Sequence, residues 1–446
     1  MQAYKLFNKE FRIDNLKKIY TEKIMFNSSP GIDRINRRSF ERDLNSNLEI
    51  IERKANNGTY NFSKYREKLI SKGRYRKPRV ISIPTIRDKI VLRALCNILL
   101  NILHDETLSK LPQTAIHEVK TGIESGNFDY FFKIDIRNFY PSIKHDVLLK
   151  KIRKKIRKTE LINLLEGAIS QTTHGSPSDT IDTEPQGVPQ GLSISNILAS
   201  LYLNALDKKQ SASGTYSYFR YVDDILILCS SKESKILEAN LTKELQLLGL
   251  NTHCDTVDNC EKQDSGPLSK SFTYLGYKFK NNQISVKPKS VDNIKKSIMK
   301  LFAENKYSKK STLNILEWKL NLRITGCMFE NKKYGWVFYF SQLTDLKILF
   351  ELDFLVKKLA ARYKVNLTKI KVKKFVRAFN EITKNLKSTT YIPNYSEFDM
   401  DDKTSVLRDV FKMNTSDLNE TQIDVQFKKL IKNSIKELEK DVQDFY

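Results

Sequence analysis

The sequence has few cysteines and no long apolar runs, and each scarcity excludes a class of protein. Five cysteines are scattered along 446 residues, without a C-x-x-C pair and without the dense spacing of a disulfide framework. No apolar run is long enough to span a bilayer, and the polar, soon basic first residues do not form a signal peptide. We therefore expect a cytoplasmic protein without membrane segments.

Metal binding through cysteine is a weak alternative. His253, Cys254 and Cys260 lie close together in the sequence, but no second pair at zinc spacing accompanies them. We interpret all five cysteines as ordinary thiols in a reducing compartment.

Positive charge is what the sequence has in abundance. Lysine and arginine number 77 against 52 aspartates and glutamates, which gives a formal net charge of +25. A field of this sign concentrates polyanions around a protein, so nucleic acid is the expected partner. The alternative is charge that serves only solubility, and composition alone does not separate the two.

The pattern of apolar residues changes along the chain, which is too long for one ordinary core. Residues 1–60 are polar and basic with apolar positions at helical intervals, which predicts a helical lead-in. Strand and helix patterns alternate from there to about residue 280, and helical patterns alone follow, interrupted by a polar linker at 388–404. We therefore expect an α+β protein with a helical C-terminal part.

Several segments have patterns clear enough to assign. Alternating or buried apolar residues predict strands, and apolar stripes with a period of 3.6 predict helices. The helix that begins near Lys144 is strongly basic on its other faces; a solvated face is the better interpretation, and contact with phosphates is the alternative. The other expected elements are strands at 79–84, 131–136 and 272–279, a hairpin at 217–229, helices at 88–103, 195–206 and 237–248, and a loop at 171–189.

Three aspartates stand at the ends of predicted strands. Asp135 follows a buried apolar run, and β-prone residues flank Asp223 and Asp224 on both sides, as in two strands joined by a tight turn. If these strands are neighbours, the carboxylates converge and need cations between them, and hard oxygen ligands suit Mg²⁺. Two such ions about 3.5–4 Å apart activate a primer 3′-oxygen and stabilise the departing pyrophosphate. The alternative for an isolated Asp-Asp pair is a solvated turn.

These acids belong to a series of motifs that resembles the reverse transcriptase family. Tyr221-Val-Asp-Asp224 is similar to the family's Y-x-D-D box, and residues 132–143 are similar to its preceding metal-binding motif. The resemblance covers roughly residues 30–360. The enzymes that the chain resembles include those of group II introns. The remaining motifs follow the family's order: Gly31-Ile-Asp33, Lys77-Pro-Arg79 with Ile83-Pro84, Gly187 to Asn196, and Tyr274-Leu-Gly-Tyr277.

The resemblance implies a right-hand polymerase fold, in which a palm with an antiparallel sheet lies between fingers and a helical thumb. Residues 360–446 match no known motif. We expect this segment to dock RNA or to mediate self-association. The implied subdomains are a helical N-terminal lead-in at 1–60, fingers at 61–132, a palm at 133–284 that includes the loop 171–189, a helical thumb at 285–360, and a helical C-terminal extension at 361–446.

The resemblance also implies a metal site. Asp135, Asp223 and Asp224 are expected to be catalytic and to hold two Mg²⁺ ions, with Mn²⁺ as a substitute. Ile136 is expected to contribute only its backbone.

Five further residues are implied to bind the nucleotide or to help do so. Arg79, helped by Lys77 or Arg74, is expected to meet the triphosphate, because a guanidinium matches phosphate oxygens. Gln190 is expected to line the nucleotide pocket. Tyr140 stands where the family has an aromatic that blocks a ribose 2′-hydroxyl, which favours DNA synthesis. Each residue also has a purely structural alternative: Arg79 as a surface charge, Gln190 as a helix-capping loop residue and Tyr140 as a core aromatic.

The activity implied by these motifs is RNA-directed DNA synthesis from deoxynucleotides. Residues 323–326 and 334–341 resemble the thumb of defence-associated bacterial enzymes, which implies a dedicated noncoding RNA as template in antiphage defence. Template-independent, protein-primed synthesis of the abortive-infection type is the alternative within the enzyme class, and a degenerate polymerase that only holds RNA is the alternative outside it. An oligomer is compatible with each. No endonuclease, zinc or RNase H motif follows, so a complete intron mobility protein is not expected.

Overall fold

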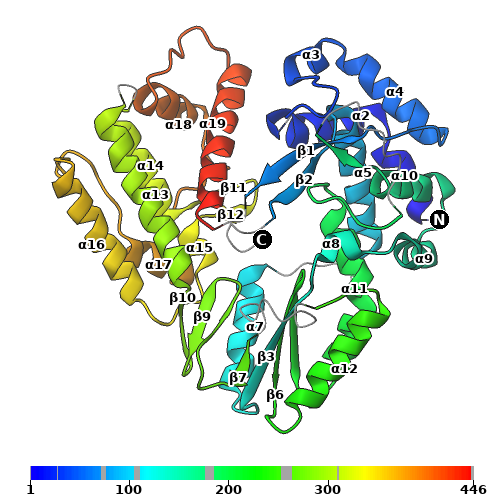
Figure 1. Cartoon of the computed structure of the whole chain (residues 1–446). Coiled ribbons are helices and arrows are strands. Elements are labelled where there is room, and N and C mark those ends of the chain that lie inside the picture. Colours follow the sequence, from blue (N-terminus) through cyan, green and yellow to red (C-terminus); the bar gives the residue numbers. More distant parts are fainter. Residues whose placement is uncertain are drawn as a thin grey trace. The chain divides into compact units, whose positions relative to one another are not determined.

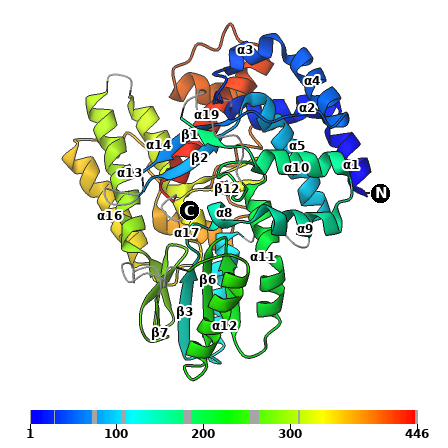
Figure 2. The same ribbon diagram turned by 45° about the vertical axis from the view of Figure 1, so that its right-hand side comes forward.

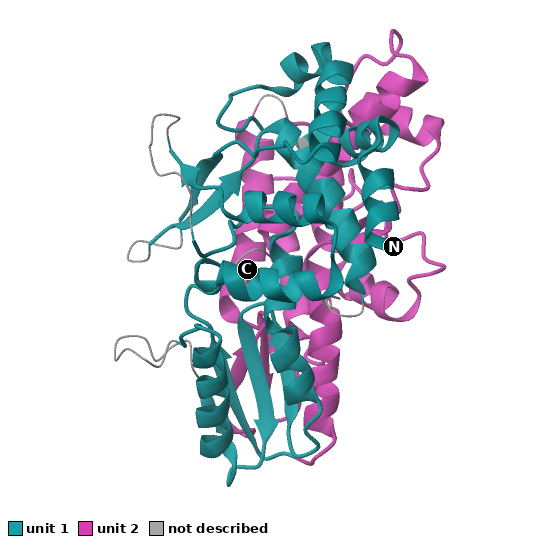
Figure 3. Cartoon of the chain, turned by 90° about the vertical axis from the view of Figure 1, so that its right-hand side faces the viewer, with its two compact units in different colours: residues 1–110, 128–266 teal, residues 111–127, 267–446 magenta. Residues whose placement is uncertain are grey.

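The computed structural model describes residues 2–27, 29–71, 77–104, 111–175, 185–252, 264–308 and 311–442. The chain divides into two compact units, which Figure 3 colours separately. Unit 1 consists of residues 1–110 and 128–266, and unit 2 consists of residues 111–127 and 267–446.

Unit 1 combines a helical N-terminal region with two sheets (Figures 1 and 2). Its helices are α1 (Gln2–Glu10), α2 (Ile13–Ile19), the π-helix η1 (Tyr20–Ile24), the 3₁₀ turn η2 (Met25–Asn27), α3 (Arg37–Arg42), α4 (Leu44–Asn56), α5 (Ile86–Ile102), α8 (Phe139–Ser142), α9 (His145–Lys155), α10 (Thr159–Ile169), α11 (Ser195–Ser211) and α12 (Ser234–Leu247). Its strands are β1 (Tyr65–Ile70), β2 (Arg79–Ile83), β3 (Tyr130–Asp135), β4 (Thr173–His174), β5 (Ser217–Tyr221), β6 (Asp224–Cys229) and β7 (Ser265–Pro267), which ends at the unit boundary.

The larger sheet of unit 1 has the strand order β5-β6-β3-β7. Strand β6 pairs antiparallel with both β5 and β3, and residues 225–229 of β6 are all buried. Helix α11 packs against β5 and helix α12 packs against β3. The apolar run in β6 is what this placement requires, because a central strand is covered on both faces.

The smaller sheet of unit 1 has the order β2-β1-β4. Strands β1 and β2 form an antiparallel pair, and β2 leads directly into α5. The Thr85 hydroxyl caps α5 by accepting a hydrogen bond of 3.2 Å from the Asp88 N–H. Helix α5 then buries an apolar stripe in the core that α1, α2 and α4 share with it.

Unit 2 is mostly helical, with short strands between its helices. Its helices are α7 (Pro112–Glu124), α13 (Pro288–Tyr307), α14 (Leu313–Thr325), α15 (Trp336–Tyr339), α16 (Lys347–Arg362), α17 (Phe375–Lys384), α18 (Met400–Ser405), the π-helix η4 (Val406–Val410) and α19 (Glu420–Lys440). Its strands are β8 (Phe272–Tyr274), β9 (Tyr277–Lys280), β10 (Gln283–Val286), β11 (Cys327–Phe329) and β12 (Lys332–Tyr334).

The short strands of unit 2 correct two predictions. Residues 272–279 are not one strand but two, β8 and β9, because Leu275 and Gly276 both have positive φ and form a tight turn between paired Tyr274 and Tyr277. Helices alone do not follow residue 280 either. The hairpin turns before β10 and before β12 use asparagine, a residue that tolerates a left-handed backbone better than most.

The C-terminal segment after residue 361 shares its core with earlier parts of unit 2. Apolar residues of α19 pack with Leu407 and Tyr395, with Leu322 of α14, and with Cys327 and Phe329 of β11. A capping box formed by Asn419 and Gln422 starts α19. The segment is therefore an integral part of unit 2.

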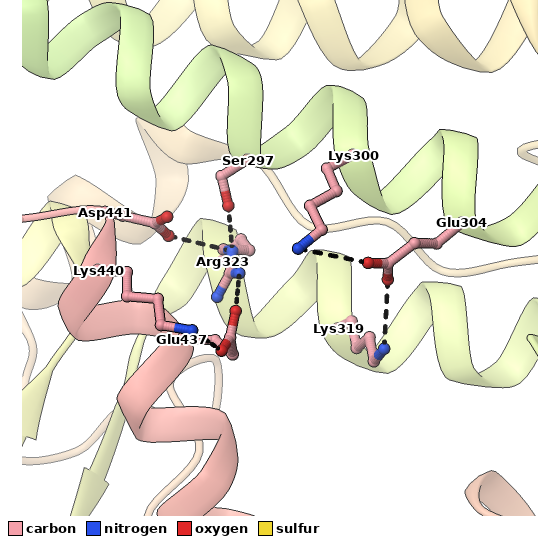
Figure 4. Close-up of polar contacts among 8 residues, drawn as sticks. All are labelled: Ser297, Lys300, Glu304, Lys319, Arg323, Glu437, Lys440 and Asp441. Carbon is pink, nitrogen blue, oxygen red and sulfur yellow. Dashed lines mark hydrogen bonds and ion pairs between the residues drawn. The ribbon is translucent and has the colours of Figure 1, made fainter. Parts of the chain in front are cut away.

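A polar network lies at the other end of α19 (Figure 4). Arg323 of α14 donates a 2.6 Å hydrogen bond from Nε to Ser297 Oγ of α13. The same Nε lies 3.0 Å from Asp441 Oδ2, and Nη2 lies 3.9 Å from Glu437. Two consecutive helices and the distant C-terminal segment thus meet at one guanidinium.

Most of the element predictions are confirmed. The expected mixture of helix and sheet is present, and the strands and hairpin that carry the three aspartates are β3, β5 and β6. The loop predicted at 171–189 contains the short strand β4, and its residues 176–184 lie outside the described residues. The assignment of fingers, palm, thumb and their boundaries stays a prediction.

The structure bears in part on the predictions about membrane segments and about the cysteines. Among the described residues, no helix is long and apolar enough to cross a membrane. Cys96, Cys229 and Cys327 are buried free thiols, as expected of ordinary cysteines. His253, Cys254 and Cys260 lie outside the described residues.

Candidate active site in unit 1

The three predicted catalytic aspartates lie at one end of the larger sheet. Asp135 is the last residue of β3 and Asp224 is the first residue of β6, and the two are directly opposite in the antiparallel register. Asp223 occupies the turn between β5 and β6, and its carbonyl accepts a 3.2 Å hydrogen bond from the Ile136 N–H. Residues opposite each other in such a pair have Cβ atoms about 4.5–5.5 Å apart. The register therefore brings Asp135 and Asp224 together, with Ile136 beside Asp223.

Lys133 adds a positive charge to this group of acids. It precedes Asp135 by two residues on β3, so both side chains point to the same face of the sheet. Its Nζ lies 3.8 Å from Asp224 Oδ1, and its side chain is 14% exposed. In the part of the chain that the structure describes, no group of three or more His, Cys, Asp or Glu side chains is arranged as a metal cluster. The use of the aspartates as metal ligands stays a prediction.

Tyr140 lies on the short helix α8, close to the acidic turn. Its hydroxyl donates a 2.6 Å hydrogen bond to Asn196 Oδ1 at the start of α11. Burial raises the pKa of the Tyr140 hydroxyl, the negative charge of Asp223 raises it further, and the positive charge of Arg79 opposes both. Tyr140, Asp223 and Arg79 are thus close enough to influence one another electrostatically.

Gln190 belongs to a loop that is hydrogen-bonded on two sides. Its carbonyl accepts a 2.7 Å hydrogen bond from the Ser82 N–H of β2. On the other side, the Val188 N–H donates to the Tyr140 carbonyl at 2.9 Å. Gly191 follows with φ of +108°, and a Cβ there would lie 2.9 Å from Ser82 O, so only glycine permits this approach to β2. The loop holds Gln190 between β2 and α8.

The structure describes two of the three basic residues that are predicted to bind the triphosphate. Arg79 begins β2, next to the loop of Gln190, and is half-buried. Lys77 is exposed two residues before it. Arg74 lies outside the described residues. The structure therefore groups Arg79 with Tyr140 and Gln190, and it places Lys77 just before the strand that Arg79 begins.

Three residues of this region escaped the sequence-based prediction. Asn196 and Lys133 lie inside motifs that were recognised, but no pattern assigns them a partner. Arg220 directly precedes the Y-x-D-D box and bonds to Asp207 of α11, which lies outside the recognised motifs. The signal that was present, a charged residue beside a motif on an otherwise apolar strand, was not specific enough to identify them.

The part of the chain that contains this site matches a known protein family. Residues 70–279, a little under half of the chain, match the family model described as "Reverse transcriptase (RNA-dependent DNA polymerase)". This range contains β2, the loop of Gln190, Tyr140 and all three aspartates.

The chain carries a reverse transcriptase domain.

Similar curated proteins support this assignment and show homology to group II intron-encoded proteins. Protein YkfC of Escherichia coli is 25% identical over 196 residues, which cover 40% of this chain and 49% of that protein. The group II intron-encoded protein LtrA of Lactococcus lactis is 28% identical over 172 residues, which cover 36% of this chain and 28% of that protein. The chain thus spans about half or less of the length of these relatives.

Solved structures that resemble the chain include telomerases. Apo telomerase from Candida Tropicalis matches with 15% identity and a TM-score of 0.42, covering 86% of this chain and 64% of that chain. The sequence relatives and the family model thus agree on a reverse transcriptase domain in this chain.

Proposed function

We propose that this protein is an RNA-directed DNA polymerase that extends a primer with deoxynucleotides by two-metal-ion catalysis. The observation that carries the proposal is the register of the larger sheet. It sets Asp135 opposite Asp224, with Asp223 in the adjoining turn, inside the reverse transcriptase domain. If Asp223 and Asp224 formed only a solvated turn, the fold would not need to place a third carboxylate, Asp135, on the neighbouring strand opposite them.

The donor set suits Mg²⁺. Carboxylate oxygens and a backbone carbonyl are hard ligands, and Asp135, Asp223, Asp224 and the Ile136 carbonyl would supply them. When bound, two such ions supply activation of the primer 3′-oxygen and stabilisation of the leaving pyrophosphate. Lys133 offsets part of the negative charge while the acids are without cations, which limits their mutual repulsion.

The residues around Tyr140 would bind the incoming nucleotide. Arg79 would hold phosphate oxygens, because its guanidinium presents several donors in one plane. Gln190, fixed by the bond from Ser82 to its carbonyl, would line the pocket with its side chain. The Tyr140 ring would lie beneath the sugar and leave no room for a 2′-hydroxyl.

A primer-extension assay tests this proposal. The full-length protein is given the same primer on an RNA or a DNA template, with deoxynucleotides or ribonucleotides, in the presence of Mg²⁺. We expect extension on RNA with deoxynucleotides and none by Asp223→Asn. Extension only with ribonucleotides, or equal extension by the variant, contradicts the proposal.

The template and the biological role are proposed on the resemblance of the thumb segments. We infer that the template is a dedicated noncoding RNA and that the DNA product acts in bacterial antiphage defence. Sequencing the nucleic acid that copurifies with the protein tests this. A single RNA species complementary to a DNA product supports it, whereas a homopolymer joined to the protein indicates template-independent, protein-primed synthesis instead. Loss of phage protection in cells that carry Asp223→Asn tests the defence role.

A further inference from the structure

The turn that carries Asp223 has an unusual backbone. Tyr221 and Asp224 are paired, so Val222 and Asp223 are the two central residues of the hairpin between β5 and β6. Val222 has φ of +56°, and Asp223 is not among the residues with positive φ. Positive φ at the first central residue alone is the pattern of a type II′ turn, which normally has glycine there. A β-branched residue in this conformation is a genuine outlier, so something must hold it.

Arg220 holds the strained Val222 side of this turn, and the Ile136 N–H holds the Asp223 carbonyl. Arg220 donates a 2.7 Å hydrogen bond from its Nη1 to the Val222 carbonyl. Its Nε donates to Asp207 Oδ1 at 2.7 Å, and its Nη2 donates to Asp207 Oδ2. The Arg220 side chain is only 10% exposed, so the charged hydrogen bonds are protected from water.

Asp207 anchors this arrangement to a rigid element. It lies on α11, whose apolar residues are buried over most of the helix. The Tyr218 hydroxyl donates a second hydrogen bond, of 2.9 Å, to Asp207 Oδ1. A helix fixed in the core is thus connected through Asp207 and Arg220 to the carbonyl group immediately before Asp223.

We propose that Arg220 and Asp207 form a positioning pair that fixes the Val222–Asp223 turn and thereby sets the direction of the Asp223 and Asp224 carboxylates. The effect of the pair on catalysis rests on the proposed polymerase function. Its effect on the turn does not. Without the pair, the turn can relax toward a less strained backbone, and both acids move with it. A misplacement of about 1 Å at a reacting group costs about 10²-fold in rate.

A simpler interpretation makes Arg220 a brace that only joins β5 to α11. Two features favour the positioning role. The bond from Nη1 goes to the turn and not to the helix, and the turn is the strained element. Lysine would keep the charge, but one ammonium group does not reproduce the planar fork that binds both Asp207 oxygens and the Val222 carbonyl at once.

Hydrogen exchange measured by mass spectrometry on the full-length protein tests the geometry without reference to activity. For Arg220→Gln and Arg220→Lys, we expect exchange in peptides that cover residues 217–229 to rise about tenfold or more, as loss of a charge-assisted hydrogen bond predicts. The matched control is Lys209→Gln, which breaks the exposed 2.7 Å ion pair between α11 and Glu244. It should leave these peptides unchanged. Unchanged exchange in Arg220→Gln, with a folded protein, overturns the proposal.

Primer extension then tests the consequence in catalysis. Arg220→Gln and Arg220→Lys should lose about 10²-fold in kcat, with little change in the KM for primer-template. Val222→Gly combined with Arg220→Gln should recover at least about tenfold over Arg220→Gln alone, because glycine adopts positive φ without strain. A brace would show rescue by lysine and no rescue by glycine, which overturns the positioning role. If the wild type extends no primer, the proposed function fails, and the exchange result still decides whether the pair holds the turn.

Discussion

The Tyr140 hydroxyl donates a 2.6 Å hydrogen bond to Asn196 Oδ1, which joins helix α8 to the start of helix α11. The ring is half-buried, and burial raises the pKa of the hydroxyl, so it remains a neutral donor at physiological pH. A side chain held at both its backbone and its far end has little freedom to move aside. Tyr140 therefore has the rigidity that a residue excluding a 2′-hydroxyl needs.

Replacing Tyr140 with alanine should change which sugar the enzyme accepts. We expect kcat/KM for a ribonucleotide to rise by about 10²-fold, since the clash that displaces its reacting phosphate is removed. Deoxynucleotide addition should fall only modestly. The measurement is kcat/KM for a matched ribonucleotide and deoxynucleotide with Tyr140→Ala.

Tyr140→Phe and Asn196→Ala are the controls for this prediction. Each removes the 2.6 Å hydrogen bond but leaves the ring, so sugar selection should weaken by less than in Tyr140→Ala. If Tyr140 is only a core aromatic, truncation leaves a cavity that costs about 3–5 kcal/mol and lowers stability and both activities together. An unchanged sugar preference in a well-folded Tyr140→Ala enzyme excludes Tyr140 from the site.

Substitution of the acids should separate catalysis from binding. We expect Asp135→Asn and Asp224→Asn to lose more than about 10³-fold in nucleotide addition, the scale of electrostatic catalytic groups. RNA binding should stay within about threefold, because basic residues and not the acids contact phosphates. Primer extension and filter binding on the same preparations measure the two effects. Extension within tenfold of the wild type would show that the acids are not catalytic.

The surplus of positive charge should make nucleic-acid binding depend steeply on salt. The formal charge of +25 predicts that affinity for a nonspecific duplex falls about 10³-fold or more between about 50 and 200 mM salt, if six or more phosphates are contacted. The basic face of α9 is expected to be merely solvated, so Lys150→Gln combined with Lys154→Gln should leave the slope unchanged. A flat response in the wild type would assign the charge to solubility.

The elements around the acids could be predicted because their signals are local. An apolar run that ends in Asp135, and two β-prone runs around Asp223 and Asp224, determine β3, β5 and β6 without knowledge of the rest of the chain. The register between β3 and β6 is not local. Convergence of the acids was expected on condition that their strands are neighbours and from the resemblance to the reverse transcriptase motifs, and the register itself was not predicted.

The remaining features could not be predicted, for definite physical reasons. The turn at Leu275–Gly276 preserves the apolar alternation of a single strand, so the hairpin is hidden in the pattern. Arg220 and Asp207 lie on different elements, and nothing in a helical or strand period relates them. The C-terminal segment shows helical stripes, but stripes do not say which surface covers them, and its shared core with α14 and β11 appears only in three dimensions.

Asp441 should make the stability of unit 2 depend on pH between about 4 and 6. Burial raises the pKa of its carboxyl from 3.8 to about 6, with the positive charge of Arg323 opposing that shift. The opposition is incomplete because the single N–H on Arg323 Nε donates to Ser297 Oγ, and Asp441 Oδ2, 3.0 Å from that nitrogen, receives no hydrogen bond. Asp441 Oδ2 is therefore a buried carboxylate oxygen near a positive charge but without a hydrogen bond, and the hydrogen bond between Asp441 and Ser297 lowers the pKa only in part.

The sign follows from the higher pKa in the folded state. The folded protein binds a proton at Asp441 more tightly than the unfolded chain, so the contribution of Asp441 to stability is fully present below about pH 4 and is lost as pH rises through about 6. A shift from 3.8 to about 6 corresponds to roughly 3 kcal/mol. Relative to Asp441→Asn, the free energy of unfolding of the wild type should fall by about that amount between pH 4 and pH 7.

Urea denaturation followed by tryptophan fluorescence measures this difference, since both tryptophans of the chain, Trp318 and Trp336, lie in unit 2. Other carboxyls titrate in the wild type and in Asp441→Asn alike, so they cancel when one curve is subtracted from the other. Glu420→Gln, at the exposed start of α19, is the control and should follow the wild type at every pH. If the difference between wild type and Asp441→Asn is constant from pH 4 to pH 7, Asp441 is ionised throughout, and the contact with Arg323 is a fully formed ion pair that compensates the carboxylate for its burial.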